Sequence, residues 1–305
     1  MSNVKILKSG LSSIEGLAIK KGKGDMPFLE IKNKYAEAVI SIYGAQVLSY
    51  KKTAKEGKED SDLFFVSQLA YYESGKAIKG GVPICWPWFG KNEENPDLQT
   101  HGFARNMLWN IDNAFLDESG ETTVVFSLTQ NEYTHQFWPY DFELTLTLTV
   151  GKTLKLSLET KNTGEEAFSI TQAFHPYFSI SEISQVKVNG LGGVDYLDKV
   201  TGASETMTQD GDIIIDQEVD RIYIDAPSET LIHDTKSDRN IKIRSKGSAT
   251  TVVWNPWAEI SQKSGDLEDD DYLKFICVEA ANAADDIVTI LPSKSYTLEA
   301  EYSVS

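Results

Sequence analysis

The sequence predicts a single all-β domain over residues 1–305, built as a large antiparallel β-sandwich. Three observations lead to this fold class. Apolar and polar residues alternate with a period of two in several runs, no long run shows apolar residues at helical spacing, and Gly, Asn, Asp and Ser separate the runs. No fixed repeat and no Pro- or Ser-rich linker divides the chain, so its 305 residues are read as one domain.

The clearest strand signal is FELTLTLTV, residues 142–150, followed by LKLSLETKN, residues 154–162. In both runs the leucines alternate with polar residues, which is the pattern of a strand with one buried face. The residues Gly151, Lys152 and Thr153 between them predict a hairpin turn. Further strands are expected, in chain order, at Ala38–Tyr50, Thr122–Thr129, Ala167–Phe174, Arg221–Ile224, Asn240–Ile243, Thr250–Trp254 and Leu273–Val278.

The amino-acid composition and net charge disfavour some classes of molecule as binding partners of this protein. Hydrophobic residues make up 41% of the chain and charged residues 25%, as in a soluble globular protein with a substantial core. The formal net charge of −17 disfavours nucleic acid and anionic membranes, because the protein's field repels polyanions. No run approaches the roughly 18 apolar residues of a membrane span. We therefore expect a cytoplasmic monomer, with Cys85 and Cys277 as reduced core thiols.

Several kinds of site are not expected. No metal-ligand spacing occurs, and an EF-hand loop beginning at Asp266 would need Gly and Glu where this chain has Asp271 and Cys277. The glycine-rich stretches match neither a P-loop nor a dinucleotide-binding fingerprint. No GxSxG motif is present, and neither cysteine has a basic neighbour to activate it. These absences leave general acid–base chemistry as the class to examine.

The stretch TQAFHPYFSI places His175 between Phe174 and Pro176. The proline disfavours the α region for the residue before it, so the histidine should be extended where the preceding strand ends. With an ordinary pKa of about 6.5, a histidine there can take or give a proton at cellular pH. A purely structural histidine is the simpler alternative, and it stays open.

A carboxylate is the second candidate. In YLKFICVEAANA, alternation puts Phe275, Cys277 and Glu279 on one face of a strand. Burial would raise the pKa of Glu279 toward the range useful for a general acid or base. A buried structural glutamate paired with an arginine is the alternative.

Aromatic residues gather in two loop-like segments, AIKGGVPICWPWFG and VVWNPW, which hold four of the six tryptophans. Such rings either cover the C–H faces of a sugar or fill the ends of a sandwich. Lys79 and Arg105 would supply the local positive charge that an anionic sugar needs, or else they are solvated surface residues. Asp220 in VDRIYID is a sugar-hydroxyl acceptor by hypothesis and a turn residue otherwise.

Six segments in this order carry a family resemblance: KGGVPICWPWFG, HGFAR, AFHPYF, VDRIY, VVWNPW and VEAANA. From about Ala38 to Glu299, the chain resembles the glucose-6-phosphate 1-epimerases, or hexose-6-phosphate mutarotases, of the galactose-mutarotase-like superfamily. The resemblance implies a large antiparallel β-supersandwich. It also implies that the catalytic histidine is His175 and the catalytic glutamate is Glu279.

The resemblance further implies that Lys79 and Arg105 bind phosphate and sugar, and that Asp220 binds substrate. Two positions depart from the family's pattern. Members commonly have arginine in place of Lys79, and some have glutamine in place of Thr100, which we include among the expected substrate-binding residues. Lysine keeps the charge but lacks the planar fork that binds phosphate through two parallel hydrogen bonds.

The implied reaction is interconversion of the α and β anomers of a hexose 6-phosphate, glucose 6-phosphate first, without a cofactor or metal. Glu279 would remove the anomeric hydroxyl proton while protonated His175 donates to the ring oxygen. Rotation in the open aldehyde and closure by the same pair would give the other anomer. Three alternatives remain: an aldose 1-epimerase for neutral sugars, a non-catalytic sugar-phosphate-binding protein, and a glycoside hydrolase. The hydrolase usually needs two flanking carboxylates, and the sequence offers one convincing candidate.

Overall fold

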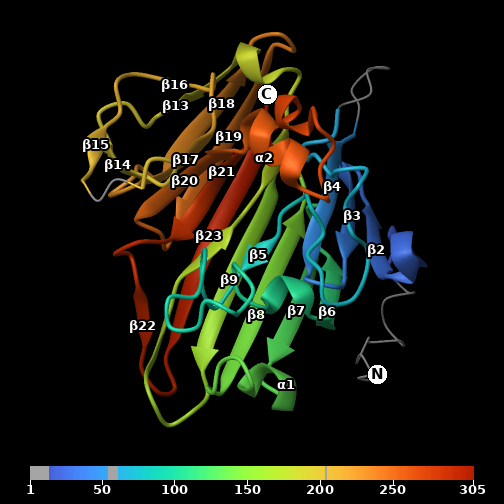
Figure 1. The fold of residues 1–305 in the computed structure, drawn as a ribbon. Helices are drawn as coiled ribbons and strands as arrows, with labels where there is room; N and C mark the ends of the chain where they lie inside the picture. Colours follow the sequence, from blue (N-terminus) through green and yellow to red (C-terminus); the bar gives the residue numbers. More distant parts are fainter. Residues whose placement is uncertain (1–13, 54–60, 203–204) are drawn as a thin grey trace.

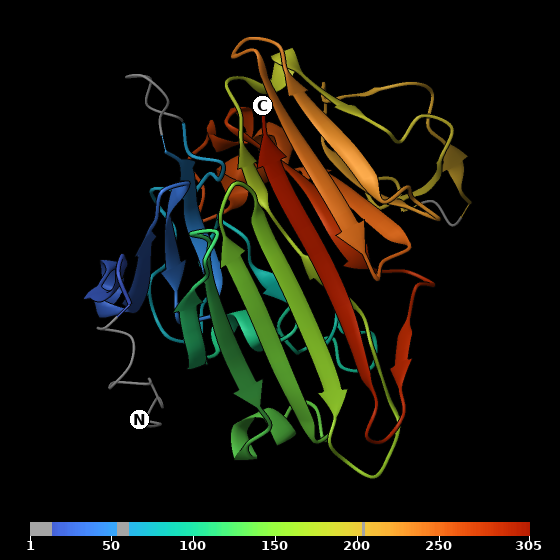
Figure 2. The same ribbon diagram turned by 180° about the vertical axis from the view of Figure 1, so that it is seen from behind.

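The computed structural model describes residues 14–53, 61–202 and 205–305, which form two large antiparallel sheets and two small ones (Figure 1). The larger sheet has nine strands in the spatial order β16 (Ile213–Ile214), β13 (Val186–Asn189), β18 (Glu229–Asp234), β19 (Arg239–Lys246), β23 (Ser295–Val304), β9 (Leu154–Asn162), β8 (Phe142–Val150), β7 (Thr122–Thr129) and β6 (Asn110–Leu116). Its long central strands run side by side in the rear view (Figure 2).

The second large sheet has eight strands in the order β15 (Met207–Thr208), β14 (Asp195–Asp198), β17 (Val219–Tyr223), β20 (Thr250–Asn255), β21 (Phe275–Asn282), β11 (Gln172–Phe174) and β5 (Ile84–Cys85), with β12 (Tyr177–Ser179) also paired to β21. A four-stranded sheet contains β1 (Leu17–Lys21), β2 (Pro27–Lys32), β3 (Ala36–Ser41) and β4 (Gln46–Lys52), and a two-stranded sheet contains β10 (Phe168–Ile170) and β22 (Val288–Ile290).

Helical structure in the described residues is short. The α-helices are α1 (Glu132–His135) and α2 (Trp257–Lys263). The 3-10 turns are Lys23–Asp25, Ala104–Asn106, Ile183–Gln185 and Asp271–Leu273. None of these helices is long and apolar enough to cross a membrane.

One continuous apolar core joins the two large sheets. Leu146 on β8 and Leu158 on β9 belong to the same fully buried cluster as Val253 on β20 and Val278 on β21. Because side chains alternate along a strand, the neighbouring positions of β20 and β21 point to the opposite face of the eight-stranded sheet. That opposite face, away from the main core, carries the candidate site.

The period-two prediction is confirmed where it is strongest. Strands β7, β8 and β9 have the predicted bounds, and β8 pairs with β9 in antiparallel register across the predicted turn. Every second residue of β8 is buried. The predicted all-β antiparallel architecture is therefore confirmed. That the chain forms a single domain stays a prediction.

Two predicted strands are each two strands in the structure. The run Ala38–Tyr50 bends after β3, and β4 then pairs back onto β3. Gly44 and Ala45 have positive φ there, which a continuous strand does not allow. The run Ala167–Phe174 is divided at Thr171, because β10 pairs with β22 while β11 pairs with β21 and β5.

Four other predicted strands have different ends, and β20 runs one residue past the predicted Trp254. The segment predicted to begin at Leu273 is a 3-10 turn as far as that residue, and β21 runs from Phe275 to Asn282. Strand β17 begins two residues before Arg221, and β19 extends the predicted Asn240–Ile243 on both sides.

Candidate active site

His175 and Glu279 face each other across two neighbouring strands. The last residue of β11 pairs with Ala280, and the first residue of β12 pairs with Cys277, so the intervening His175 lies level with Glu279. The distance from Nε2 of His175 to Oε1 of Glu279 is 3.4 Å. His175 is 7% exposed and Glu279 is 1% exposed. The structure thus brings together the two residues for which the sequence predicted acid–base chemistry.

The His175 ring is held by packing. The ring of Tyr177 stacks on it at 5.0 Å between centroids, and the ring of Trp254 meets it edge to face at 5.6 Å. The backbone N–H of His175 donates to the carbonyl of Pro83. These contacts fix the imidazole plane, as acid–base catalysis requires of a proton donor. Of the two tryptophan segments, one therefore supplies a ring at the site, while Trp86 is fully buried in the core.

Burial shifts both pKa values away from the charged forms. Burial, with a smaller effect from the nearby charges of Arg105 and Lys79, lowers the pKa of His175 to about 3. It also raises the pKa of Glu279 well above its ordinary value, with the charge of Asp220 adding to the effect. Both shifts favour the neutral forms, so a proton shared by the pair is favoured on the carboxyl, and His175 does not titrate near 6.5 as an exposed histidine would.

Three buried polar atoms at the site have no hydrogen-bond partner among the described residues: Nδ1 of His175, Oε2 of Glu279 and Nε of Arg105. Buried polar atoms are usually satisfied, because an unpaired one loses its hydrogen bonds to water without replacement. Unpaired atoms beside groups with strongly shifted pKa values are typical of a site that binds a polar ligand.

The predicted basic residues Lys79 and Arg105 both lie near this pair. Each is partly buried, and each carries a charge close enough to lower the pKa of His175. Arg105 lies in a 3-10 turn, where its Nη2 donates to the carbonyl oxygen of Thr100 at 2.8 Å. Thr100 is exposed, and its recorded contact is through this carbonyl. The structure therefore gives Thr100 a part in orienting Arg105, and its contact with substrate stays a prediction.

Asp220 lies on the same sheet face. On β17 it is opposite Trp254 of β20, which is in turn opposite Cys277 of β21. Burial raises the pKa of Asp220 to about 6, and its charge acts on Glu279. The five predicted residues other than Thr100 thus gather around one face of β17, β20 and β21.

His101 is a site residue that the sequence reasoning named only as part of HGFAR. Its φ of 63° is in the left-handed region, and its backbone N–H donates to the carbonyl of Gly90. Its Nδ1 accepts from the N–H of Gly90 at 3.2 Å, which assigns the hydrogen to Nε2. The ring lies 5.6 Å from that of His175, and burial lowers its pKa well below the ordinary value. His101 is thus a neutral donor beside the pair.

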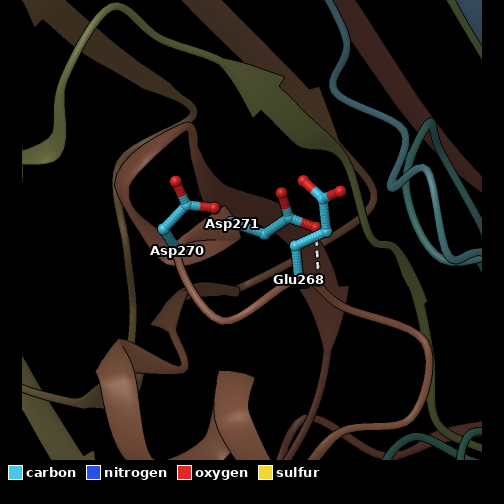
Figure 3. Close-up of side chains that lie close together, drawn as sticks. All are labelled: Glu268, Asp270 and Asp271. Atoms are coloured by element: carbon cyan, nitrogen blue, oxygen red, sulfur yellow. Dashed lines mark hydrogen bonds between the residues drawn. The ribbon is translucent and has the colours of Figure 1, made fainter.

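Three carboxylates lie together in the loop before β21: Glu268, Asp270 and Asp271 (Figure 3). The ammonium of Lys274 contacts all three, at 3.3, 2.8 and 3.0 Å respectively. The single positive charge of the lysine offsets part of the negative charge of this acidic cluster, and we assign the cluster no metal.

The comparisons with known proteins agree with this geometry. The model of the aldose 1-epimerase family matches residues 27–303. A protein of Escherichia coli K12, provisionally named glucose-6-phosphate 1-epimerase, is 34% identical over 275 residues, covering 90% of each chain. One from Cenchrus ciliaris with the same provisional name is 37% identical over 268 residues, which are 85% of this chain and 78% of that protein.

Solved structures show the same fold. The crystal structure of a provisionally named mutarotase from Salmonella typhimurium has a TM-score of 0.86 and 32% identity, covering 95% of this chain and 93% of that one. A galactose mutarotase related enzyme from Lactobacillus acidophilus has a TM-score of 0.72 at 15% identity, covering 91% of this chain and 97% of that one, and shares the fold. The chain therefore belongs to the aldose 1-epimerase family.

Proposed function

We propose that this isomerase interconverts the α and β anomers of a hexose 6-phosphate, with glucose 6-phosphate as the first candidate, and that His175 and Glu279 carry the proton transfers. The observation that carries the proposal is the buried pair itself, with Nε2 and Oε1 3.4 Å apart. Relatives that match most of this chain are provisionally named after that sugar phosphate. The substrate is a small molecule, and the mechanism needs no cofactor.

Ring opening requires one base and one acid. Ionised Glu279 accepts the proton of the anomeric hydroxyl, while protonated His175 donates a proton to the ring oxygen, and the C1–O5 bond breaks to give an aldehyde. Rotation about the C1–C2 bond turns the other carbonyl face toward the ring hydroxyl. The same two groups, with their proton roles reversed, then close the ring to the other anomer.

The proton count of the pair suits this cycle. The pair holds one proton in total, and opening moves it from the histidine side to the carboxyl side. Once the aldehyde has formed, Glu279 is a neutral acid and His175 a neutral imidazole, which are the forms that burial favours. The buried environment therefore favours the pair present with the open-chain intermediate over the ionised pair that begins ring opening. To begin a cycle the proton must pass from Glu279 to His175 over the short gap between Oε1 and Nε2.

The phosphate has candidate contacts in Arg105 and Lys79. Locally gathered positive charge offsets a net charge of −17 that would otherwise repel a dianion. An aldose 1-epimerase acting on neutral sugars is the second candidate, because Lys79 already lies 3.4 Å from the carboxylate of Asp266.

We also propose a monomeric enzyme, since one chain supplies every named group, and a reducing compartment such as the cytoplasm, since Cys85 and Cys277 are free thiols.

The test is to add the purified protein to freshly dissolved α-glucose 6-phosphate and to follow the approach to anomeric equilibrium by polarimetry. Glucose and galactose are run beside it at the same concentration. The proposal expects strong acceleration for the phosphate. Acceleration of the free sugars alone would assign the enzyme to the neutral-sugar branch, and acceleration of none would leave a sugar-phosphate-binding protein.

A further inference from the structure

Asp266 adds a charge to the site that the sequence did not predict. It lies in the loop between α2 and β21, and its Oδ1 is 3.4 Å from Nζ of Lys79. The Lys79 side chain is 24% exposed and that of Asp266 is 21% exposed. The pair is therefore partly shielded from solvent, unlike ordinary surface ion pairs, in which water and salt screen most of the attraction.

A single buried residue, Ser67, is hydrogen-bonded both to the backbone of Lys79 and to the loop that carries Asp266. The backbone N–H of Ser67 donates to the carbonyl oxygen of Lys79 at 3.1 Å. The hydroxyl of Ser67 donates to Oδ2 of Asp271, in the loop that carries Asp266, at 2.9 Å. Ser67 is 0% exposed and Asp271 is 1% exposed. Asp271 also accepts from the N–H of Glu268, which ties the loop to itself (Figure 3).

An apolar anchor follows Asp266 directly. Leu267 is 2% exposed and belongs to a buried cluster with Tyr177, Phe275 and Cys277. Tyr177 is the ring that stacks on His175. Moving Asp266 away from the site would withdraw Leu267 from this cluster and expose its apolar surface to water. The carboxylate is therefore a fixed part of the site.

A fixed carboxylate decides which group suits Lys79. A phosphate dianion placed against this ammonium would also meet the negative charge beside it, which is unfavourable. Sugar hydroxyls fit better, because one hydroxyl can donate to the carboxylate while another accepts from the ammonium. Arg105 forms no ion pair with any of the described residues, and its Nη2 donates to the neutral carbonyl of Thr100. The guanidinium charge of Arg105 is thus available to a phosphate.

We propose that Asp266 is a substrate-binding residue that commits Lys79 to the hydroxyls of the sugar ring and leaves the phosphate to Arg105. This inference rests on the proposed function and divides the work of the two cations, which the family resemblance treats alike. It predicts that removing the charge of Asp266 weakens phosphorylated and unphosphorylated sugars to the same degree.

The experiment compares Asp266→Asn with Asp269→Asn, an exposed residue three positions along the same loop. For each variant, kcat/KM and affinity are measured with glucose 6-phosphate and with glucose. We expect Asp266→Asn to lower kcat/KM about 10- to 100-fold for both sugars, the range for hydrogen bonds to a charged group, with the ratio between the sugars unchanged within about threefold. Asp269→Asn should match the wild type, and equal melting temperatures would show that both variants fold.

A double-variant cycle with Lys79→Met tests the pairing. If the two side chains act on the ring together, the loss in the double variant is smaller than the product of the single losses. Higher kcat/KM for glucose 6-phosphate with unchanged glucose kinetics in Asp266→Asn would overturn the inference, because Asp266 would then make no contribution to binding the sugar ring. Unchanged kinetics with both sugars would overturn it too.

Affinity separates this inference from the proposed function. If the wild type binds both sugars by isothermal titration calorimetry but does not speed anomer exchange, the proposed function fails. The effects of Asp266→Asn on the two dissociation constants still decide the role of Asp266. If the wild type binds neither sugar, both claims fail.

Discussion

At the scale of single residues, His175 and Glu279 share one proton in a place where neither charge is favoured. Burial is the main cause of both shifts, which oppose each other: the histidine loses its proton more readily and the carboxyl keeps its proton longer. Because the two groups are 3.4 Å apart, the proton can change sides with little movement of heavy atoms. Because one proton moves between them, one of the two groups can act as the proton donor while the other acts as the acceptor.

The pH dependence of stability follows from the same proton. Between the ordinary pKa values of 4.5 for glutamate and 6.5 for histidine, the unfolded pair holds its proton on His175 and the folded pair holds it on Glu279. Folding then moves no net proton at the pair. In Glu279→Gln, His175 titrates alone with a lowered folded pKa, so the unfolded chain binds the extra proton below pH 6.5. Stability should therefore fall as pH falls, by up to about 1.4 kcal/mol per pH unit more than in the wild type.

Urea unfolding of both proteins at pH 5 and pH 6.5 measures this difference. Groups common to the two proteins cancel in the comparison. Parallel stability curves would contradict the neutral state assigned to buried His175.

Arg105 should act on the phosphate and not on the sugar ring. Arg105→Ala should lower kcat/KM for glucose 6-phosphate about 10- to 100-fold, because a charge-assisted hydrogen bond is lost, and should change glucose less than about threefold. Arg244→Ala is a control with the same change in net charge, since Arg244 is an exposed residue of β19 paired with Glu229. Equal losses for both sugars in Arg105→Ala would deny Arg105 a phosphate role.

At the scale of elements, the loop that carries His101 and Arg105 is fixed by close backbone contact. Gly102 has a φ of 70°, and a Cβ at this position would lie 1.9 Å from the carbonyl oxygen of Trp86. Only glycine allows both the conformation and the approach. His101 and Arg105, which lie on either side of Gly102 in the chain, are thereby held at the edge of the eight-stranded sheet.

Gly102→Ala should therefore impair both folding and activity. The backbone strain alone is worth roughly 1–3 kcal/mol, and the clash with Trp86 adds to it. Gly193→Ala is the matched control, because Gly193 has a φ of 81° with no heavy atom within 4 Å of the added Cβ. Thermal unfolding and anomer exchange are measured for both. Similar losses in the two variants would mean that contact with Trp86 does not position the loop.

Sequence predicts those elements whose signal is local. The alternation in β8 and β9 records burial on one face, so their bounds could be read directly. The divisions at Gly44 and Thr171 could not, because the apolar pattern continues where the chain changes its pairing partner. In the same way, alternation and motif placed His175 and Glu279 in the site, whereas Asp266 reaches Lys79 only through a tertiary contact across 187 positions.

At the scale of the whole molecule, the site depends on a core shared by the two large sheets. The face of the eight-stranded sheet opposite the site packs into the same cluster as the leucines of β8 and β9. The strands that set His175 level with Glu279 thus pack, on their core face, against the nine-stranded sheet. The geometry of the proposed active site and the global stability are coupled for this reason.

Unfolding should accordingly be one cooperative transition. Leu146→Ala, in the nine-stranded sheet and 0% exposed, should cost about 2–5 kcal/mol and move the whole calorimetric peak to lower temperature. Agreement between the calorimetric and van't Hoff enthalpies checks the single-domain prediction. Two peaks, of which only one moves in the variant, would show that the sheets unfold as separate units.

The central claim is that His175 and Glu279 exchange the anomers by proton transfer. It is tested most directly by NMR magnetisation exchange between α- and β-glucose 6-phosphate, with wild type, His175→Ala and Glu279→Gln at equal concentration. We predict fast exchange in the wild type and a loss of about 10²- to 10⁴-fold in each variant, with unchanged circular dichroism. Near-wild-type exchange in either folded variant would contradict the claim.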